Sequence, residues 1–413
     1  MELARATNRS VRLRNRSALL SRLFLDGPLT RQHLMRSTGL SQPAVSNVVA
    51  DLIDEGLVAE AGAAESDGGR PGMMLRVASR YAHVVGVDVG ETRIRVELFD
   101  FAMTLLSSVE YSLDPARTEP SAVAGHVLAG IDTVTTRARV SPADVLGVGI
   151  GVSGVVEQGV EAVVHAQALG WGRVPLERLI RAGTDLPLHI DNGANTLGQA
   201  EMWFGAGRGA RHAVFALVGS GVGAAVVTDG AAYRGASSSA GEWGHTTLVY
   251  GGRSCRCGAR GCLEAYVGAE AIIDRYREAR GGRAVPGADE ESQLAALVEA
   301  AAESPTARRV LDETAGYLGA GVANLINLFN PERVVLGGWA AMALGDLLPA
   351  VREAAGRQAL RQPYEQASIE LCRLGVDAVA LGAATLPIAR LLAAGGVRPG
   401  RADRRTRKGA PLH

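Results

Sequence analysis

The sequence predicts an α/β protein that begins with a winged helix-turn-helix and continues into a larger part built on two similar lobes. Three observations carry this prediction. A short series of amphipathic helices opens the chain, a strand, glycine turn and strand pattern occurs twice further on, and one histidine is followed by three cysteines at metal-ligand spacing.

Length and composition limit the classes of protein to which this chain can belong. Its 413 residues, of which 47% are hydrophobic, are enough for two or three domains with buried cores. We find no signal-peptide pattern and no apolar run of membrane-spanning length, so we expect a cytoplasmic protein that contacts no membrane. Three of the four cysteines stand at metal-ligand spacing, which favours a reducing compartment over a disulfide framework. The fourth, Cys372, lies in an apolar stretch and is expected in the core.

The first 36 residues are strongly basic and contain two helices. Eight arginines stand against two acidic residues, a net charge of +6 that favours a polyanionic partner. Apolar side chains recur at helical spacing between Asn15 and Leu25, and the Asp-Gly-Pro sequence that follows ends that helix. Thr30 is expected to cap a second helix that reaches Ser37, with Gly39 in the turn after it.

A third helix, capped by Ser41, has the spacing of a recognition helix. With its valines facing inward, its short polar side chains face outward, as contacts to base edges in the major groove require. We therefore predict binding to a double-stranded DNA operator. The predicted base contacts are Ser41, Gln42, Ser46 and Asn47.

Two strands after Gly56, Leu57–Glu60 and Met74–Val77, are expected to form the wing. In the glycine-rich tip between them, Arg70 is predicted to reach a phosphate or the minor groove. The alternatives are an ordinary linker arginine and, for the whole unit, a three-helix module that binds protein instead of DNA.

The larger part opens with predicted strands at His83–Val89, Arg93–Asp100 and Thr104–Tyr111. The acid, glycine and hydroxyl of the first turn, Asp88 to Thr92, are able to hold phosphate or hydrated Mg²⁺. A second hairpin of this kind follows at Phe215–Thr228, which indicates a duplicated lobe.

The spacing His-x9-Cys-x-Cys-x4-Cys predicts a structural zinc site. One imidazole and three thiolates complete a tetrahedral shell and leave no open position for a reactive water. Two carboxylates interleave with these ligands and indicate that the loop also holds a polar ligand. The alternative is a reduced thiol cluster, although the residues between the ligands form a polar loop with little means of burying itself. The predicted metal ligands are His245, Cys255, Cys257 and Cys262.

Taken together, the two hairpins, the Gly-Glu-x-Gly-His sequence and the zinc cysteines resemble the ROK family of sugar kinases, repressors and open reading frames, over about residues 82 to 390. The resemblance implies two actin-like, ribonuclease H-like α/β lobes of the sugar-kinase ATPase type, with a cleft between them. It implies that Asn192, Glu242, His245 and Glu264 bind a sugar, with His245 using its other ring nitrogen for zinc. Gly170-Trp171 resembles the family's cleft-lining loop.

We therefore expect three parts along the chain. Residues 1–80 form the DNA-binding domain. Residues 81–395 form the ROK domain, with lobes at about 81–195 and 196–395. Residues 396–413 form a disordered basic tail.

The sequence departs from the kinases of this family at the residue that acts as the base. Their Glu-Asn-Asp-Ala-Asn sequence reads Asp-Asn-Gly-Ala-Asn here, so that Gly193 replaces the catalytic aspartate. Asp191 lies two residues away, about 6 to 7 Å along an extended chain, which is beyond reach of the same hydroxyl. Glu91 and Ser220, where the kinases commonly have glycine and threonine, weaken nucleotide binding as well. We expect no catalytic residue and no useful kinase activity.

The function hypothesis is a transcriptional regulator, a repressor of carbohydrate-metabolism genes, whose DNA affinity is set by a sugar effector. Such a protein is expected to be a homo-oligomer, a dimer or a tetramer, that matches the spacing of DNA half-sites. The alternatives are an ATP-dependent sugar kinase and a regulator that ignores sugars and responds to another partner.

Overall fold

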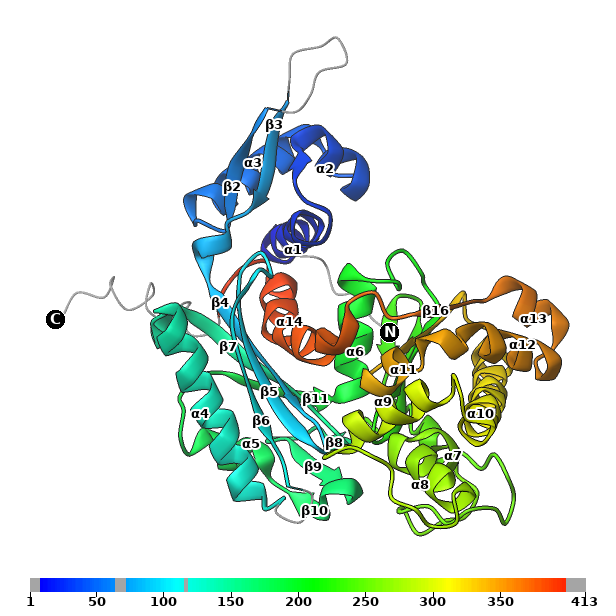
Figure 1. Ribbon diagram of the computed structural model, residues 1–413. Coiled ribbons are helices and arrows are strands. Elements are labelled where there is room, and N and C mark those ends of the chain that lie inside the picture. Colours follow the sequence, from blue (N-terminus) through cyan, green and yellow to red (C-terminus); the bar gives the residue numbers. More distant parts are fainter. Residues whose placement is uncertain (1–7, 64–71, 115–117, 399–413) are drawn as a thin grey trace.

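The computed structural model describes residues 8–63, 72–114 and 118–398 (Figure 1). An N-terminal unit of helices and a small sheet, ordered β1-β3-β2, lies at one end of a larger two-lobed body. The N-terminal elements are α1 (Asn8–Asp26), β1 (Leu29–Thr30), α2 (Arg31–Thr38), α3 (Gln42–Asp54), β2 (Val58–Ala63) and β3 (Met73–Val77).

Local sequence explains this unit, and the winged helix-turn-helix prediction agrees with it. The Thr30 hydroxyl accepts a hydrogen bond from the His33 amide and so caps α2. Gly39 adopts a φ of 69°, which a glycine takes without strain at a helix C-terminus. The valines of α3 that were expected to face inward are buried. Two boundaries differ by three residues or more, since α1 begins at Asn8 rather than at Asn15 and β2 ends at Ala63 rather than at Glu60.

The first lobe is a sheet ordered β11-β7-β4-β5-β6, with helices packed against it. Its three antiparallel strands match the predicted ones to within a residue at most ends. The elements of this lobe are β4 (His83–Val89), β5 (Arg93–Asp100), β6 (Leu105–Ser112), α4 (Pro120–Ala138), β7 (Val145–Val152), β8 (Val155–Glu157), β9 (Val163–Ala166), β10 (Trp171–Val174), α5 (Leu176–Arg181) and β11 (Leu188–Asn192).

The second lobe repeats the topology of the first, in agreement with the predicted duplication. In each sheet a central strand, β4 or β12, has an antiparallel hairpin on one side and parallel strands on the other. The elements of this lobe are β12 (Ala213–Val218), β13 (Val222–Thr228), β14 (Ala231–Tyr233), α7 (Glu264–Val267), α8 (Ala269–Ala279), α9 (Glu290–Ala300), α10 (Pro305–Phe329), β15 (Arg333–Gly337), α11 (Trp339–Ala343), α12 (Leu348–Gln358), α13 (Arg361–Gln366) and β16 (Ser368–Leu371).

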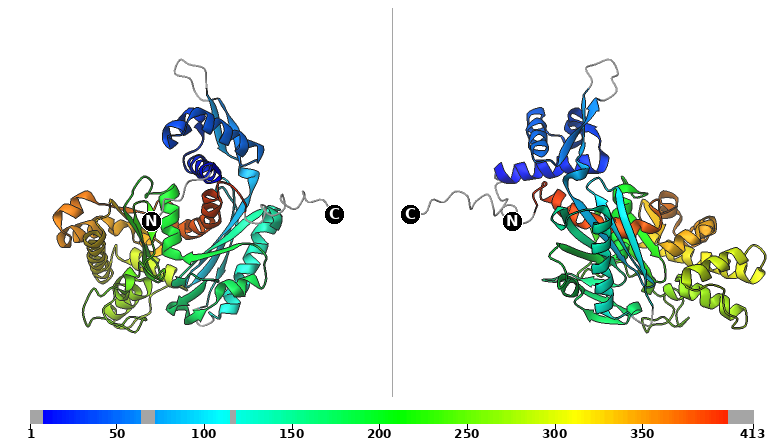
Figure 2. Two further views of the ribbon diagram at one scale, coloured as in Figure 1. Left: turned by 180° about the vertical axis from the view of Figure 1, so that it is seen from behind. Right: turned by 60° about the vertical axis from the view of Figure 1, so that its left-hand side comes forward.

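Two further helices, α6 (Gly193–Phe204) and α14 (Ala378–Ala393), lie between the lobes (Figures 1 and 2). They pack against each other, α14 on β4 and β7 of the first sheet and α6 on β12 and β13 of the second. Within the described residues, α14 with the turn before it is the one helix long and apolar enough to span a membrane, and it is a core helix. Although α14 follows the second lobe in sequence, it packs on the sheet of the first.

The N-terminal unit is fixed to this helix pair by aromatic and polar contacts. The Phe24 ring of α1 lies 5.6 Å from Trp203 and 6.2 Å from Phe204, the last residues of α6. Arg16 of α1 donates a hydrogen bond to the carbonyl of Gly395, just after α14, at 2.8 Å. The ends of both inter-lobe helices therefore touch the unit that carries the predicted recognition helix.

The first residues of the predicted tail are part of the folded body. The Arg398 guanidinium stacks 4.6 Å from the Tyr81 ring centroid and donates to the Tyr81 carbonyl, so residues 396–398 pack on the folded body. Residues 399–413 and Arg70 of the predicted wing tip lie outside the described residues.

A buried acid in the first sheet makes stability depend on pH. The Glu97 side chain is 3% exposed, and its nearest cation, Arg95, is 3.9 Å away. Burial above all, with nearby Asp88 and Glu110 and against the attraction of Arg95, raises the pKa of Glu97 to about 7. Because this folded-state pKa lies above the unfolded value of 4.5, the stability that the protonated acid contributes is lost as pH rises through about 7.

We predict that Glu97→Gln, which carries no charge to bury, becomes more stable relative to wild type between pH 5 and pH 8. The gain is at most about 3 kcal/mol, from about 1.4 kcal/mol per pKa unit. Urea unfolding at both pH values measures it, with Glu299→Gln, an exposed acid of the second lobe, as control. Equal pH dependence in wild type and Glu97→Gln would contradict the prediction.

Candidate functional site

A cavity of about 450 Å³ lies between the two lobes. The turn between β4 and β5 borders it from the first lobe, and the turn between β12 and β13 borders it from the second. The start of α6 and the residues before α14 complete its wall. The cavity brings together all four residues that the family resemblance assigns to sugar: Asn192, Glu242, His245 and Glu264.

The four predicted metal ligands form one compact cluster. Their ligand atoms all lie within 4.8 Å of one another. Cys255 Sγ is 3.7 Å from His245 Nδ1, and Cys257 Sγ is 3.7 Å from Cys262 Sγ. Zinc–sulfur bonds of about 2.3 Å in a tetrahedron place ligand atoms about 3.8 Å apart, so the cluster has the size that a tetrahedral metal requires.

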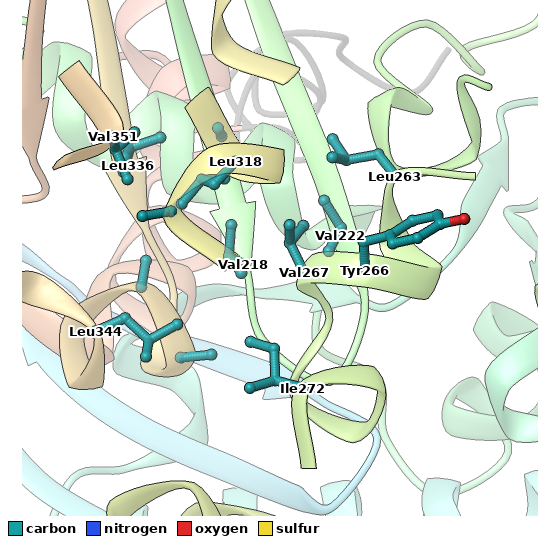
Figure 3. Packing of buried hydrophobic residues seen from close by; sticks show 14 of the residues in the cluster. Val218, Val222, Leu263, Tyr266, Val267, Ile272, Leu318, Leu336, Leu344 and Val351 are labelled. Carbon is teal, nitrogen blue, oxygen red and sulfur yellow. The ribbon is translucent and has the colours of Figure 1, made fainter. Parts of the chain in front are cut away.

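Backbone hydrogen bonds and the second-lobe core shape the metal loop. The Cys255 amide donates to the Ala259 carbonyl at 2.9 Å. Gly261 has a φ of 81°, and a Cβ there would lie 1.7 Å from the Val249 carbonyl oxygen, so that only glycine fits. Cys255 and Cys262 are buried, whereas most residues between the ligands, such as Gly258 and Arg260, are exposed, as expected of a polar loop. Figure 3 shows the following residue, Leu263, among the apolar side chains of this lobe.

Asn192 is the N-cap of α6 and part of the cavity wall. Its side-chain oxygen accepts from the Ala194 amide at 2.8 Å and from the Asn195 amide at 3.4 Å. Its amide nitrogen donates to the Gly154 carbonyl at 2.7 Å. Asn192 therefore fixes where α6 begins, and one N–H of its side-chain amide remains for a ligand.

Two carboxylates beside the metal cluster differ in their surroundings. Glu264 is 6% exposed and accepts a hydrogen bond from the Val222 amide at 2.9 Å. Among the described residues, none donates a hydrogen bond to the Glu242 carboxylate. Burial raises the pKa of Glu242, with His245 opposing the shift and Glu264 adding to it. Glu242 is thus a half-buried acceptor that remains available to the hydroxyl of a ligand.

An arginine within the metal loop joins the two lobes. Arg256 Nε donates to Glu264 at 2.9 Å, and its terminal nitrogens donate to the two oxygens of Glu91 at 2.5 and 2.9 Å. Although burial alone would lower it, the pKa of Arg256 is raised by these two carboxylates. Glu91 belongs to the first lobe, so this Glu91–Arg256–Glu264 bridge spans the cavity. Glu91 was noted in the sequence because the kinases commonly have glycine there, but nothing in the sequence indicated that Arg256 is its partner.

Asp191, the acid nearest the missing catalytic position, is held in other contacts. Arg234 donates to both of its oxygens, at 2.9 and 2.6 Å, and Asn195 donates to one of them at 3.0 Å. Asp191 is 5% exposed, and it is not among the residues that line the cavity, whereas Gly193 is. A Cβ on Gly193 would meet no atom closer than 3.7 Å, so the packing leaves room for a side chain there.

The loop expected at Gly170-Trp171 is placed differently. The preceding residues, His165 to Ala168, line the cavity. Trp171 is 4% exposed and donates its indole N–H to the Thr118 carbonyl at 2.6 Å. Trp171 is therefore a core residue of the first lobe. The segment that lines the cavity ends before Gly170-Trp171.

The predicted DNA contacts lie on one side of α3. Ser41, Gln42 and Asn47 are exposed, and Ser46 is half-buried. Ser41 is the N-cap by position, but its side chain makes no capping hydrogen bond, so its hydroxyl is available.

Comparison with known proteins matches this architecture. The model of the ROK family matches residues 84–390. A xylose repressor from Caldicellulosiruptor bescii is 31% identical over 92% of this chain and 96% of its own length. A glucokinase from Halalkalibacterium halodurans is 32% identical over 72% of this chain and 92% of its own length.

Among solved structures, a ROK family transcriptional regulator described as a homologue of the Escherichia coli MLC protein is similar with a TM-score of 0.75 and 25% identity. The similarity covers 94% of this chain and 98% of that one, and so includes the N-terminal unit. The glucokinase match covers a smaller share of this chain. The family model and the full-length relatives together show that this chain belongs to the ROK family.

Proposed function

We propose that the protein is a transcriptional repressor of carbohydrate-metabolism genes, and that a sugar in the cavity sets its affinity for DNA. One observation carries the proposal. Helix α6 begins in the cavity wall at Gly193 and ends at Trp203 and Phe204, which pack on Phe24 of the N-terminal unit. A ligand that prefers one position of α6 would therefore act, through these contacts, on the unit that carries the recognition helix.

The chemistry of the cavity supports a sugar as the effector. Hydroxyl groups donate to carboxylates, and Glu242 and Glu264 both line the cavity. Asn192 and His245 complete the proposed set, with His245 also a metal ligand. Relatives that match nearly the whole chain are described as xylose repressors, which favours a pentose or hexose.

The N-terminal unit is the proposed operator-binding domain, about residues 1–80, followed by the ROK domain to about residue 395. Ser41, Gln42, Ser46 and Asn47 are the proposed base contacts, and Arg70 a proposed phosphate or minor-groove contact. Two copies would place two recognition helices on half-sites about 34 Å apart, so a homodimer or tetramer is the proposed assembly. A cytoplasmic location follows from this role.

Zinc is the proposed metal, with a structural role. One imidazole and three thiolates are a donor set that zinc takes in four-coordinate structural sites, and the ligand spacing fits. Glu242 and Glu264 lie beside this cluster. The metal would fix the loop that carries Arg256.

The kinase alternative is not favoured, although glucokinases are among the relatives. A positioned base contributes roughly 10²- to 10⁴-fold to such a reaction. Gly193 offers none, and Asp191 is bound by Arg234 outside the cavity wall. The alternative of a regulator that ignores sugars is left to experiment.

For the effector, we predict that xylose, glucose or N-acetylglucosamine raises the thermal midpoint of the zinc-loaded protein. A ligand at 100 times its Kd adds about 2.7 kcal/mol of stability. The same sugar is expected to change the affinity for DNA selected from a random library, measured by fluorescence anisotropy. Glu242→Gln should lose both responses, and Glu278→Gln, an exposed acid outside the cavity, should keep them. DNA binding without any sugar response would favour the sugar-blind regulator.

For the metal, we predict that the purified protein holds about one zinc per chain and that Cys257→Ser loses it, because three ligands leave the shell incomplete. The unfolding free energy should fall by at least about 2 kcal/mol, since metal binding contributes to folding. Elemental analysis and thermal denaturation measure both. Cys372→Ser, whose hydroxyl keeps the hydrogen bond to Glu201, is the matched control and should retain zinc. Full zinc content in Cys257→Ser would contradict the assignment.

For catalysis, we predict that the wild-type protein releases no ADP from ATP, Mg²⁺ and its effector sugar. Gly193→Asp should fold with an unfolding free energy within about 1 kcal/mol of wild type, because an acid at the first turn of a helix is favourable and the Cβ has room. A coupled ADP assay and urea unfolding measure these quantities. Sugar-dependent ADP release by the wild type would instead support the kinase.

A further inference from the structure

The bridge across the cavity fills the space between the two glycine turns. A Cβ added to Gly221 of the second turn would lie 2.7 Å from Glu91 of the first turn and 3.0 Å from Arg256. The side chains of Glu91 and Glu264 are 12% and 8% exposed. The two turns thus meet through a largely buried ion pair at the cavity wall.

Some of the donors that a phosphate group could use at these turns are already used by the chain. The Gly90 amide donates to the Arg93 carbonyl, and the Gly219 amide donates to the Gly221 carbonyl, both at 2.9 Å. The Ser220 hydroxyl donates to Glu290. A phosphate depends on such backbone and hydroxyl donors, so these contacts leave fewer of them for it at these turns.

The charges around the cavity also disfavour an anion. Among the described residues that line it, four are acidic and two are arginines. Arg256 is held by Glu91 and Glu264, and Arg93 forms an ion pair with Glu291. A dianionic phosphate would meet carboxylates without a free cation to balance it.

We propose that the Glu91–Arg256–Glu264 bridge determines ligand specificity, so that the cavity accepts an uncharged sugar and rejects a sugar phosphate. The inference rests on the proposed sugar-binding function and deepens it. An uncharged sugar needs only acceptors for its hydroxyls, which Glu242 and the free lone pairs of Glu264 supply without breaking the bridge. A phosphate would have to separate Arg256 from Glu91, and the released carboxylate would repel it.

Glu91 is the residue whose change tests this. Glu91→Gln keeps the size of the side chain and removes its charge. The terminal N–H groups of Arg256 are then less strongly held, and a guanidinium fork binds phosphate oxygens in pairs. Glu91→Ala removes the partner altogether and serves as a second variant. Glu278→Gln is the matched control, because Glu278 makes the same two-pronged contact with Arg253 of the same loop, outside the cavity.

Calorimetric titration with glucose and glucose 6-phosphate, and with the effector sugar and its phosphate, measures the ratio of the two Kd values. Wild type and Glu278→Gln should bind the uncharged sugar at least about tenfold more tightly than its phosphate. Glu91→Gln and Glu91→Ala should lower this ratio by about tenfold or more, mainly by tightening phosphate binding. Zinc content and circular dichroism establish that each variant is folded.

Equal affinity of wild type for both forms, or an unchanged ratio in folded Glu91→Gln and Glu91→Ala, would overturn the specificity role while leaving the sugar-responsive function intact. A different pattern marks failure of the function itself. If neither form binds any variant while the protein still binds DNA, the sugar-responsive function is wrong, and the inference falls with it.

Discussion

The close contact of α14 with its neighbours is the constraint on which the rest of the structure depends. A Cβ on Gly86 of β4 would lie 2.0 Å from the Ala380 carbonyl oxygen, and one on Gly149 of β7 would lie 1.7 Å from that of Ala383. On the other side of the helix, a Cβ on Gly382 would lie 1.8 Å from the Thr196 carbonyl oxygen of α6. Backbone packs on backbone at these points, so the helix cannot move away from the sheet without losing buried contacts.

Through this packing, α6, α14 and the first sheet form one packed unit that reaches from the cavity to the N-terminal unit. Gly193 and Val379, near the first residues of the two helices, line the cavity. Their far ends meet α1 through Trp203 and through the Gly395 carbonyl. A ligand that shifts the balance between two arrangements of the lobes would therefore act on both attachments of the N-terminal unit together. On the proposed function, the two helices connect the effector site to the DNA-binding unit, so the site and the unit need no direct contact.

Features with a local cause were predictable from the sequence. The ligand spacing placed His245 in the metal cluster, and the strands predicted at His83–Val89 and Arg93–Asp100 have the observed ends of β4 and β5. The sequence Gly147-Val-Gly149-Ile-Gly151 carried a further signal that was missed. Alternate residues of a strand share one face, and all three glycines face α14. The pairing of Glu91 with Arg256 was not predictable, because 165 positions separate them and only the folded lobes bring them together.

The position of that pair bears on why a kinase-like fold would serve as a sensor. An enzyme of this shape must open and close around two substrates at each turnover, so contacts across its cleft have to break repeatedly. In this chain Glu91 and Arg256 occupy the meeting point of the turns, and Gly193 supplies no base. On the proposed function, the absence of a base slows the reaction, but it leaves the energy of sugar binding free to favour one arrangement of the lobes. On the proposed specificity role, the bridge rejects phosphate. If it forms only when the lobes are close, it also determines how readily the cleft closes. Ligand choice and DNA response would then depend on the same three side chains.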